Sequence, residues 1–265
     1  MKKYKKRLPE ESMKNSFFAR AASLLCALTL FSTAALAAPS FSWYCVRKKD
    51  HVRPVCEPNM AFIEKHGGHY LGNDEKVIYL TFDAGYENGN VERILDTLKA
   101  HNAHGAFFVL SNLIKTNTDL VLRMANEGHL VCNHTVRHKD MSAFSDADFE
   151  AELRALENIA KEYGVPLAPF YRPPEGRFSE QNLICAEKMG YDTVFWSFAY
   201  ADWDNARQPR RESAMKLILD NTHNGEIALL HPTSKTNADI LDALLTEWEA
   251  QGYRFGELWE LKEGL

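Results

Sequence analysis

Short apolar segments alternate with amphipathic segments from Lys76 to the end of the chain. The apolar segments carry many β-branched and aromatic residues and have no polar face, which is typical of strands buried on both sides. They are "VIYLTF" (77–82), "GAFFVL" (105–110), "HLVCN" (129–133), "PFYR" (169–172), "DTVFWS" (192–197), "EIALLH" (226–231) and "YRF" (253–255). This pattern predicts a sheet of about seven strands.

The segments between these strands have the apolar spacing of helices. One helix is predicted around Val91, Ile94, Leu95 and Leu98, which follow the i, i+3, i+4, i+7 rule. A second is predicted to begin at Ser145, where Asp148 three residues later resembles a capping box, and to end before Gly164. A third apolar face is formed by Ile240, Leu241, Leu244, Leu245 and Trp248 and ends at Gly252.

Strands that alternate with helices predict the α/β class, with a parallel sheet and the helices outside it. The length of this region suits a closed or nearly closed barrel. An open doubly wound sheet remains the alternative, because periodicity does not separate the two architectures.

The first 37 residues have the pattern of a signal peptide. Seven basic residues are followed by an apolar run, Ala21 to Phe31, and by Ala35-Leu36-Ala37, which resembles a cleavage site. The apolar run is shorter than the roughly 20 residues that span a membrane. We expect export to the cell wall or the outer side of the membrane, with cleavage near Ala37. An uncleaved anchor is the alternative.

Cleavage would change the charge of the chain. The leader holds 7 of the 31 Lys and Arg residues and 2 of the 36 Asp and Glu residues. The remaining 228 residues then carry 24 basic and 34 acidic groups, a net charge of −10. A nucleic-acid partner is not expected, because it requires a basic surface. No stable protein partner is indicated either.

Four cysteines remain after the leader, which contains Cys26. Cys45 and Cys56 flank the polar loop "CVRKKDHVRPVC", and export makes a disulfide between them the expected state. Cys132 and Cys185 lie in apolar surroundings and are expected to be buried thiols. A zinc ribbon is not predicted, because no cysteine pair has C-x2-C spacing.

Polar groups follow five of the predicted strands. They are Asp83, the pair His134 and His138, the segment Arg172–Gly176, the pair Asp202 and Trp203, and His231. The carboxyl ends of parallel strands meet at one rim, which carries the active site in such folds. Five chain segments are therefore predicted to place polar side chains at a common site.

Each of these residues also has a purely structural interpretation. His134 and His138 are four residues apart, so on a helical turn they would share one face, from which two histidines can bind one metal. Most histidine pairs with this spacing, however, have no function. Asp83 would cap the helix start at Asn88–Asn90, and His231 would make a structural hydrogen bond. Arg172 would pair with an acid at the rim, and Asp202 and Trp203 would form a packed turn.

The order of five motifs resolves these alternatives. "TFDAG", "HTVRH", "RPPEG", "ADW" and "LLH" resemble, in that order, the motifs of the polysaccharide deacetylase family, the NodB-homology domains. The resemblance covers about residues 76–262 and implies a catalytic domain folded as a distorted (β/α)7–8 barrel. "DAGYENG", "YRPPEGRFS", "FWSFAYADW" and "LLHPTSKTNA" are similar to one branch, the delta-lactam-biosynthetic de-N-acetylases of spore-cortex peptidoglycan.

The resemblance also implies roles for the residues at the rim. His134 and His138 match the histidines that bind a divalent ion in such enzymes, and Asp83 matches the catalytic base. Ala84 stands where most of the family has a second aspartate that binds the metal. We therefore expect a weakly bound ion, Zn²⁺, Mn²⁺ or Co²⁺, whose coordination is completed by water or substrate.

The remaining predicted roles concern proton transfer and substrate. His231 is expected to protonate the departing amine, Arg172 to keep Asp83 ionised, and Asp202 to orient or charge-stabilise His231. Trp203 is expected to offer an apolar face to a sugar ring. The other predicted substrate-binding residues are Pro174, Glu175 and Gly176.

The expected activity is metal-assisted hydrolysis of a carbohydrate amide, a C–N bond that is not a peptide bond. In this branch the substrate is an N-acetylmuramic acid residue of peptidoglycan, and deacetylation leads to muramic delta-lactam. The alternatives are a deacetylase of N-acetylglucosamine or another glycan, an O-acetyl esterase, and a glycan-binding domain without catalysis. The arm of residues 38–75 is expected to cover the barrel bottom, with glycan contact as the alternative.

Overall fold

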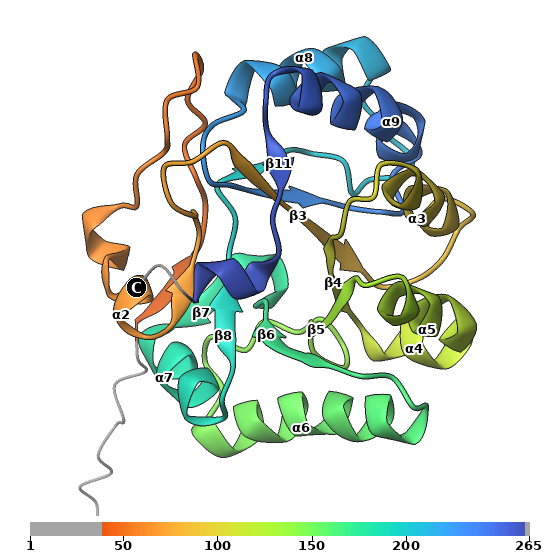
Figure 1. Ribbon diagram of the computed structural model, residues 1–265. Coiled ribbons are helices and arrows are strands. Elements are labelled where there is room, and N and C mark those ends of the chain that lie inside the picture. The colour runs from red at the N-terminus through yellow and green to blue at the C-terminus, as the bar shows by residue number, and fades with distance from the viewer. Residues whose placement is uncertain (1–38, 263–265) are drawn as a thin grey trace, which may run out of the picture. The chain divides into compact units, whose positions relative to one another are not determined.

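A curled parallel sheet forms the centre of the computed structural model, which describes residues 39–262 (Figure 1). Its nine strands lie in the order β2-β8-β6-β5-β4-β3-β10-β9, with β11 paired to β3, and every pairing is parallel. The strands are β2 (Gly68–His69), β3 (Val77–Ala84), β4 (Ala106–Val109), β5 (Leu130–Asn133), β6 (Ala168–Tyr171), β8 (Asp192–Val194), β9 (Phe198–Ala199), β10 (Glu226–Leu230) and β11 (Arg254–Phe255).

The two edges of this sheet approach each other. β8 and β9 lie near opposite ends of the strand order, yet only residues 195–197 connect them. Leu71, just beyond the edge strand β2, bridges Glu226 at the start of β10. The sheet is therefore a curled, incomplete barrel. The predicted barrel is confirmed, and the open doubly wound sheet is wrong.

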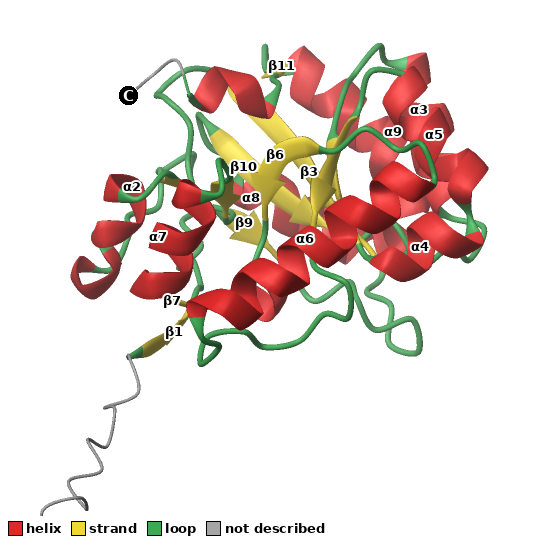
Figure 2. Ribbon diagram, turned by 90° about the horizontal axis from the view of Figure 1, so that it is seen from below, coloured by secondary structure: helices red, strands yellow, loops and turns green. Residues whose placement is uncertain are grey.

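Helices cover the outside of the sheet, as Figure 2 shows. They are α2 (Phe62–Lys65), α3 (Val91–Ala100), α4 (Ser111–Thr116), α5 (Thr118–Asn126), α6 (Asp146–Glu162), α7 (Glu180–Lys188), α8 (Arg211–Asn221) and α9 (Lys235–Ala250), with short 3-10 turns η2 (Pro58–Met60), η3 (Pro174–Gly176) and η4 (Leu258–Leu261). The predicted start of α6 is confirmed, because the Ser145 hydroxyl accepts a hydrogen bond from the Asp148 N–H.

Two hydrophobic clusters lie on the two faces of β3. Ile78, Leu80 and Phe82 pack outward against the helices, whereas Val77 and Tyr79 pack into the barrel. Burying each large apolar side chain contributes roughly 1.5–3 kcal/mol to stability. Asp83 is the single position of β3 that is not buried. The strand is thus apolar on both faces, as predicted, up to the point where its acid reaches the rim.

The N-terminal arm follows a different course from the one predicted. β1 (Ser40–Ser42) pairs antiparallel with β7 (Arg177–Ser179), and the Trp43 N–H donates to the Gly176 carbonyl at 2.7 Å. These contacts place the start of the arm beside the segment that follows β6, at the rim. The arm reaches the opposite end only farther on, where His51 Nδ1 donates to the Thr222 carbonyl at 2.9 Å.

The two cysteines of the arm pack against the same hydrophobic cluster, and the disulfide between them stays a prediction. Cys45 and Cys56 are free thiols in the structure. Burial, followed by the neighbouring Cys56, raises the pKa of the Cys45 thiol to about 12. Cys132 and Cys185 are buried free thiols, as predicted.

The predicted signal peptide, residues 1–37, lies outside the described residues. Within residues 39–262, no helix has both the length and the apolar character needed to cross a membrane.

A carboxyl group is fully buried at the start of β10. The side chain of Glu226 is inaccessible, and its Oε2 accepts a hydrogen bond from the His223 N–H at 3.1 Å. His223 Nε2 lies 2.8 Å from the Ser197 hydroxyl. Burial raises the pKa of Glu226 well above its ordinary value, more than the His223 N–H lowers it.

We predict that Glu226→Gln flattens the dependence of stability on pH. The raised pKa of the folded state stabilises the protein below the unfolded value, about 4.3, and this contribution is lost as pH rises through the folded pKa. Glutamine cannot ionise, so this loss should disappear when unfolding free energies are measured from pH 4.5 to 8. The exposed Glu64→Gln variant should keep the wild-type slope. Parallel curves for wild type and Glu226→Gln would contradict the prediction.

Candidate active site

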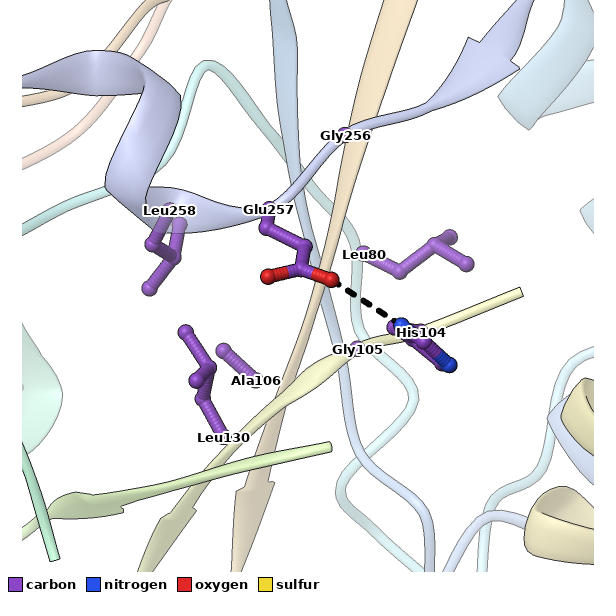
Figure 3. A pocket seen from close by; sticks show the side chains of 8 residues that line it. All are labelled: Leu80, His104, Gly105, Ala106, Leu130, Gly256, Glu257 and Leu258. Atoms are coloured by element: carbon purple, nitrogen blue, oxygen red, sulfur yellow. Dashed lines mark hydrogen bonds and ion pairs between the residues drawn. The ribbon is translucent and has the colours of Figure 1, made fainter. Parts of the chain in front are cut away.

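A cleft of about 840 Å³ opens at the carboxyl ends of the strands. Its lining includes Asp83, His134, His138, Glu175, Trp203 and His231. Six of the ten residues predicted to form the site therefore share one cavity. A hollow of about 10 Å³ at the other end of the sheet, between Leu80 and Leu130, holds no more than a water molecule (Figure 3). The large cleft is the candidate site.

Arg172 is fully buried beneath the cleft and orients Asp83. Its Nη1 donates to Asp83 Oδ1 at 2.9 Å. The other guanidinium donors bind the carbonyls of Val194 and Phe195 and the Thr81 hydroxyl, at 2.9 to 3.0 Å. Its guanidinium carbon lies 4.2 Å from the centre of the Phe108 ring. Arg172 is therefore held on all sides by β3, β4 and the segment after β8.

Two opposing effects set the pKa of Asp83. Burial raises it, but the neighbouring His134 and Arg172 lower it, and the net result is a pKa below the usual value. The side chain retains 13% exposure toward the cleft. Asp83 is thus an ionised carboxylate that is fixed on one oxygen and accessible from the cavity.

His134 presents an unprotonated nitrogen to the same carboxylate. Its Nδ1 donates to the Arg172 carbonyl at 2.9 Å, which leaves Nε2 with a lone pair. Nε2 is buried, lies 3.5 Å from Asp83 Oδ2 and has no hydrogen-bond partner among residues 39–262. Burial lowers the pKa of His134 to about 4, so the ring is neutral at neutral pH. A backbone-anchored neutral imidazole is the usual form of a metal-binding histidine.

The second histidine reaches the site through a loop and not along a helical turn, which corrects the expected placement. Residues 134–140 have no helix, and Thr135 and His138 have φ values of 74° and 55°. Two local hydrogen bonds stabilise this path, from the Thr135 N–H to Asn133 Oδ1 and from the His138 N–H to the Thr135 hydroxyl. The rings of His134 and His138 lie 4.9 Å apart, edge to face.

Asp202 and His231 form a hydrogen-bonded pair on the other side of the cleft. His231 Nδ1 donates to Asp202 Oδ1 at 2.7 Å, and the His231 N–H donates to Oδ2 at 2.8 Å. Asp202 is fully buried and also accepts from Asn237 Nδ2 at 2.6 Å. Burial lowers the pKa of His231, but the charge of Asp202 outweighs this and the net pKa is raised. Nε2 is the ring nitrogen left for the cleft.

Asn237 is a site residue that the sequence patterns did not reveal. It lies in the first turn of α9, donates to both Asp202 and the His231 carbonyl, and accepts from the Tyr200 hydroxyl. Its only sequence signal is its place six residues after His231, inside the stretch "LLHPTSKTNA". It positions the acid that in turn positions the histidine.

The loop predicted to bind substrate contributes a single side chain to the cleft. Glu175 lines the cavity, whereas Pro174 and Gly176 are buried. A Cβ at Gly176, where φ is 66°, would lie 2.9 Å from the Trp196 ring and 3.1 Å from the Trp43 Cβ. Pro174 and Gly176 therefore shape the loop and do not face the cavity.

Two aromatic side chains are exposed at the mouth of the cleft. Trp203 is 60% exposed, and its ring lies 6.1 Å from that of His231. Tyr86, which was not predicted, is 43% exposed, and its hydroxyl accepts a hydrogen bond from Asn205 Nδ2 at 2.6 Å. Exposed aromatic faces beside polar groups suit an amphipathic ring such as a sugar.

The donors present fit a divalent ion only in part. Within residues 39–262, no group of three or more His, Cys, Asp or Glu side chains is arranged to hold a metal. The unpartnered Nε2 of His134 and the adjacent His138 supply two imidazoles. Ala84 places a methyl group on the wall where a third protein ligand would stand. The structure thus offers two imidazoles, and the two-histidine metal site stays a prediction.

Comparison with known proteins identifies the family of the chain. The profile of the polysaccharide deacetylase family matches residues 71–194. The chain is 37% identical over 247 residues to the Bacillus subtilis peptidoglycan-N-acetylmuramic acid deacetylase PdaA, covering 90% of this chain and 94% of that protein. It is 34% identical over 198 residues to a Bacillus cereus peptidoglycan-N-acetylglucosamine deacetylase, covering 71% and 89%.

A solved structure shows the same fold. The structure of Bacillus subtilis PdaA, described as a family 4 carbohydrate esterase, superimposes with a TM-score of 0.80 at 38% identity, covering 84% of this chain and 97% of that one. The chain belongs to the polysaccharide deacetylase family. The enzyme class and the barrel predicted from the five motifs are confirmed.

We predict that Asp202→Asn lowers the pKa of His231. The negative charge of Asp202 raises this pKa, and asparagine keeps the shape of the side chain without the charge. Nuclear magnetic resonance of the imidazole C–H signals during a pH titration measures the change. Asp204→Asn, two residues away on a partly exposed acid, is the matched control and should leave the His231 titration in place. An unshifted His231 in Asp202→Asn would contradict the assignment.

Proposed function

We propose that this protein removes the N-acetyl group from muramic acid residues of peptidoglycan. The observation that carries the proposal is the convergence of an ionised Asp83 and a proton-holding His231 on one cleft. A similar relative that covers nearly the whole chain has this activity by name. The expected amide hydrolysis requires both a base and an acid.

The two sides of the cleft divide the proton transfers between them. Asp83 takes a proton from water, and the water oxygen attacks the acetamide carbon. The C–N bond then breaks as His231 donates a proton to the sugar nitrogen, so that acetic acid and a neutral amine leave. Proton donation at nitrogen is necessary because an amide anion is a very poor leaving group.

The buried neighbours keep these two groups in the required protonation states. The charge of Arg172 beside Asp83 favours the carboxylate that accepts a proton. The charge of Asp202 beside His231 favours the imidazolium that donates one. Asn237 holds Asp202 in place for this role. Asp202 thus acts through His231 and does not itself reach the cleft.

His134 and His138 would hold a divalent ion, Zn²⁺, Mn²⁺ or Co²⁺. Such an ion supplies polarisation of the acetamide carbonyl and lowers the pKa of bound water. His134 contributes Nε2, whose lone pair is oriented by the Arg172 carbonyl. Ala84 removes one expected ligand, so binding is weaker than at a site with three protein ligands.

The cleft is suited to a sugar of a glycan strand. Trp203 and Tyr86 offer aromatic faces at its mouth, and Glu175 offers a hydrogen-bond acceptor on another wall. Deacetylation of muramic acid places an amine beside the lactyl carboxyl of the same sugar. Ring closure to a lactam is favoured by this proximity. An exported enzyme acting in the wall would supply the muramic delta-lactam of spore cortex.

We predict acetate release from peptidoglycan glycan that an amidase has stripped of peptides. The protein is incubated separately with this substrate, with intact glycan and with N-acetylglucosamine oligomers. Mass analysis of the fragments then measures the acetyl groups removed from each. Asp83→Asn and His231→Ala should each lower kcat about 10²- to 10⁴-fold. His134→Ala and a chelator should also abolish activity, whereas His101→Ala, at the C-cap of α3 and remote from the cleft, should not.

Other outcomes of the same digestion would support different functions. Equal acetate release from stripped and intact glycan would reject the muramic specificity and favour a general glycan deacetylase. Activity only on O-acetyl sugars would indicate an esterase. Binding to glycan without release of acetate, with every ion, would indicate a non-catalytic domain. Activity that survives both the chelator and His134→Ala would reject the metal assignment.

A further inference from the structure

A loop of the N-terminal arm concentrates exposed apolar side chains. Within residues 39–262, seven large hydrophobic side chains are exposed, and two of these, Tyr86 and Trp203, line the cleft. Four of the other five belong to a single segment, the Tyr44–Val55 loop. They are Tyr44, Val46, Val52 and Val55, which are 50% to 76% exposed. Such clustering marks an interaction surface.

The same loop is basic in an acidic protein. It holds four cationic residues, Arg47, Lys48, Lys49 and Arg53, and one acid, Asp50. The chain after Ala37 has 34 acidic and 24 basic residues, so the loop has the opposite charge to its surroundings. A negatively charged partner would therefore be attracted to the loop and repelled by the rest of the surface.

The charges of this loop are only partly neutralised. Lys49 lies 3.7 Å from Asp220 and Arg53 lies 3.8 Å from Asp74, both long contacts near the surface. Arg47 and Lys48 are exposed and form no ion pair with any residue in the range 39–262. At least two cations are thus available to a partner.

The tip of the loop has a defined backbone. Asp50 and His51 both have φ of 59°, and the Val52 N–H donates to the Lys49 carbonyl at 3.2 Å, which forms a tight turn. Residues with positive φ cost about 1–3 kcal/mol each and gather at functional sites. The other non-glycine residues with positive φ in the range 39–262 are Asn102, Thr135, His138 and Glu175, and two of these, His138 and Glu175, line the cleft. The loop therefore has a defined backbone conformation at its tip and is more than a flexible connection.

The tip of the loop lies at the end of the barrel opposite the cleft, whereas Tyr44 follows Trp43 at the rim. His51 Nδ1 donates to the Thr222 carbonyl and Lys49 contacts Asp220, next to the start of β10. His231, in the cleft, follows the last residue of the same strand. The loop projects beside α8, as Figure 1 shows.

We propose that the Tyr44–Val55 loop binds an anionic phospholipid bilayer. Its valines are suited to the acyl region, because aliphatic side chains gain energy from hydrocarbon contact whereas sugar rings stack on aromatic faces. Its cations would lie at the level of the phosphate groups. Electrostatic attraction alone and apolar contact alone each give weak membrane binding. The two together give stable but reversible attachment.

This attachment would orient the enzyme. Because the tip of the loop lies near the start of β10 and the cleft lies beyond the end of this strand, a molecule bound through the tip would turn its cleft away from the lipid. The cleft would then face the glycan strands outside the membrane. The inference concerns a separate surface, so it holds or fails independently of the proposed reaction.

The test is sedimentation of the protein from Ala38 onward with lipid vesicles. Wild type should pellet with vesicles that contain phosphatidylglycerol and remain soluble with pure phosphatidylcholine. Arg47→Gln with Lys48→Gln should weaken the partition coefficient by about fivefold for each charge removed. Val52→Ser with Val55→Ser should weaken it as well, and added salt should weaken binding of the wild type.

A matched control separates this loop from general charge effects. Lys115→Gln with Lys161→Gln removes two exposed lysines of α4 and α6 and should leave vesicle binding at the wild-type level. All variants should keep the wild-type rate on soluble glycan fragments, which shows that they are folded. Equal loss of binding in the loop and control variants would overturn the proposal. So would binding of wild type to purified glycan but not to vesicles.

Discussion

The buried guanidinium of Arg172 is the constraint on which the site depends. A buried charge must be paired, and here the partner is Asp83 at the only accessible position of β3. The backbone carbonyl of the same arginine fixes the tautomer of His134. One residue therefore helps His134 to keep the proposed base ionised and also fixes the free lone pair of the proposed metal ligand. Removing either partner of such a pair costs roughly 3–5 kcal/mol, so stability and chemistry are coupled here.

The opposite wall of the cleft repeats this arrangement with reversed charge. A fully buried acid, Asp202, pairs with His231 and is itself held by Asn237. The two walls come from different strands, β3 and β10, which are adjacent in the sheet. Because these strands are parallel and in register, their carboxyl ends are brought together by the fold. The barrel thus places an acceptor and a donor of protons on one cavity.

The sequence predicted those features that depend on periodicity and on the direction of strands. Apolar runs identified β3 and β10, and parallel topology then implied that Asp83 and His231 meet at one rim. It did not reveal features that depend on side-chain contacts between distant segments, such as the roles of Asn237 and Tyr86. The left-handed backbone at Thr135 was missed because β-branched residues rarely adopt it.

The predicted roles of Pro174 and Gly176 were limited by the same lack of contacts. The tight packing of Gly176 against Trp43 and Trp196 joins segments far apart in the chain. Residues of a sequence motif can therefore stabilise the conformation of a loop without contacting the substrate.

The most direct test of the account is anomalous diffraction from crystals of the protein soaked with Zn²⁺. The account predicts one peak within bonding distance, about 2.0–2.1 Å, of nitrogen atoms of both His134 and His138, beside the Asp83 carboxylate. A zinc ion bound elsewhere, with these two imidazoles uncoordinated at full soak, would contradict it.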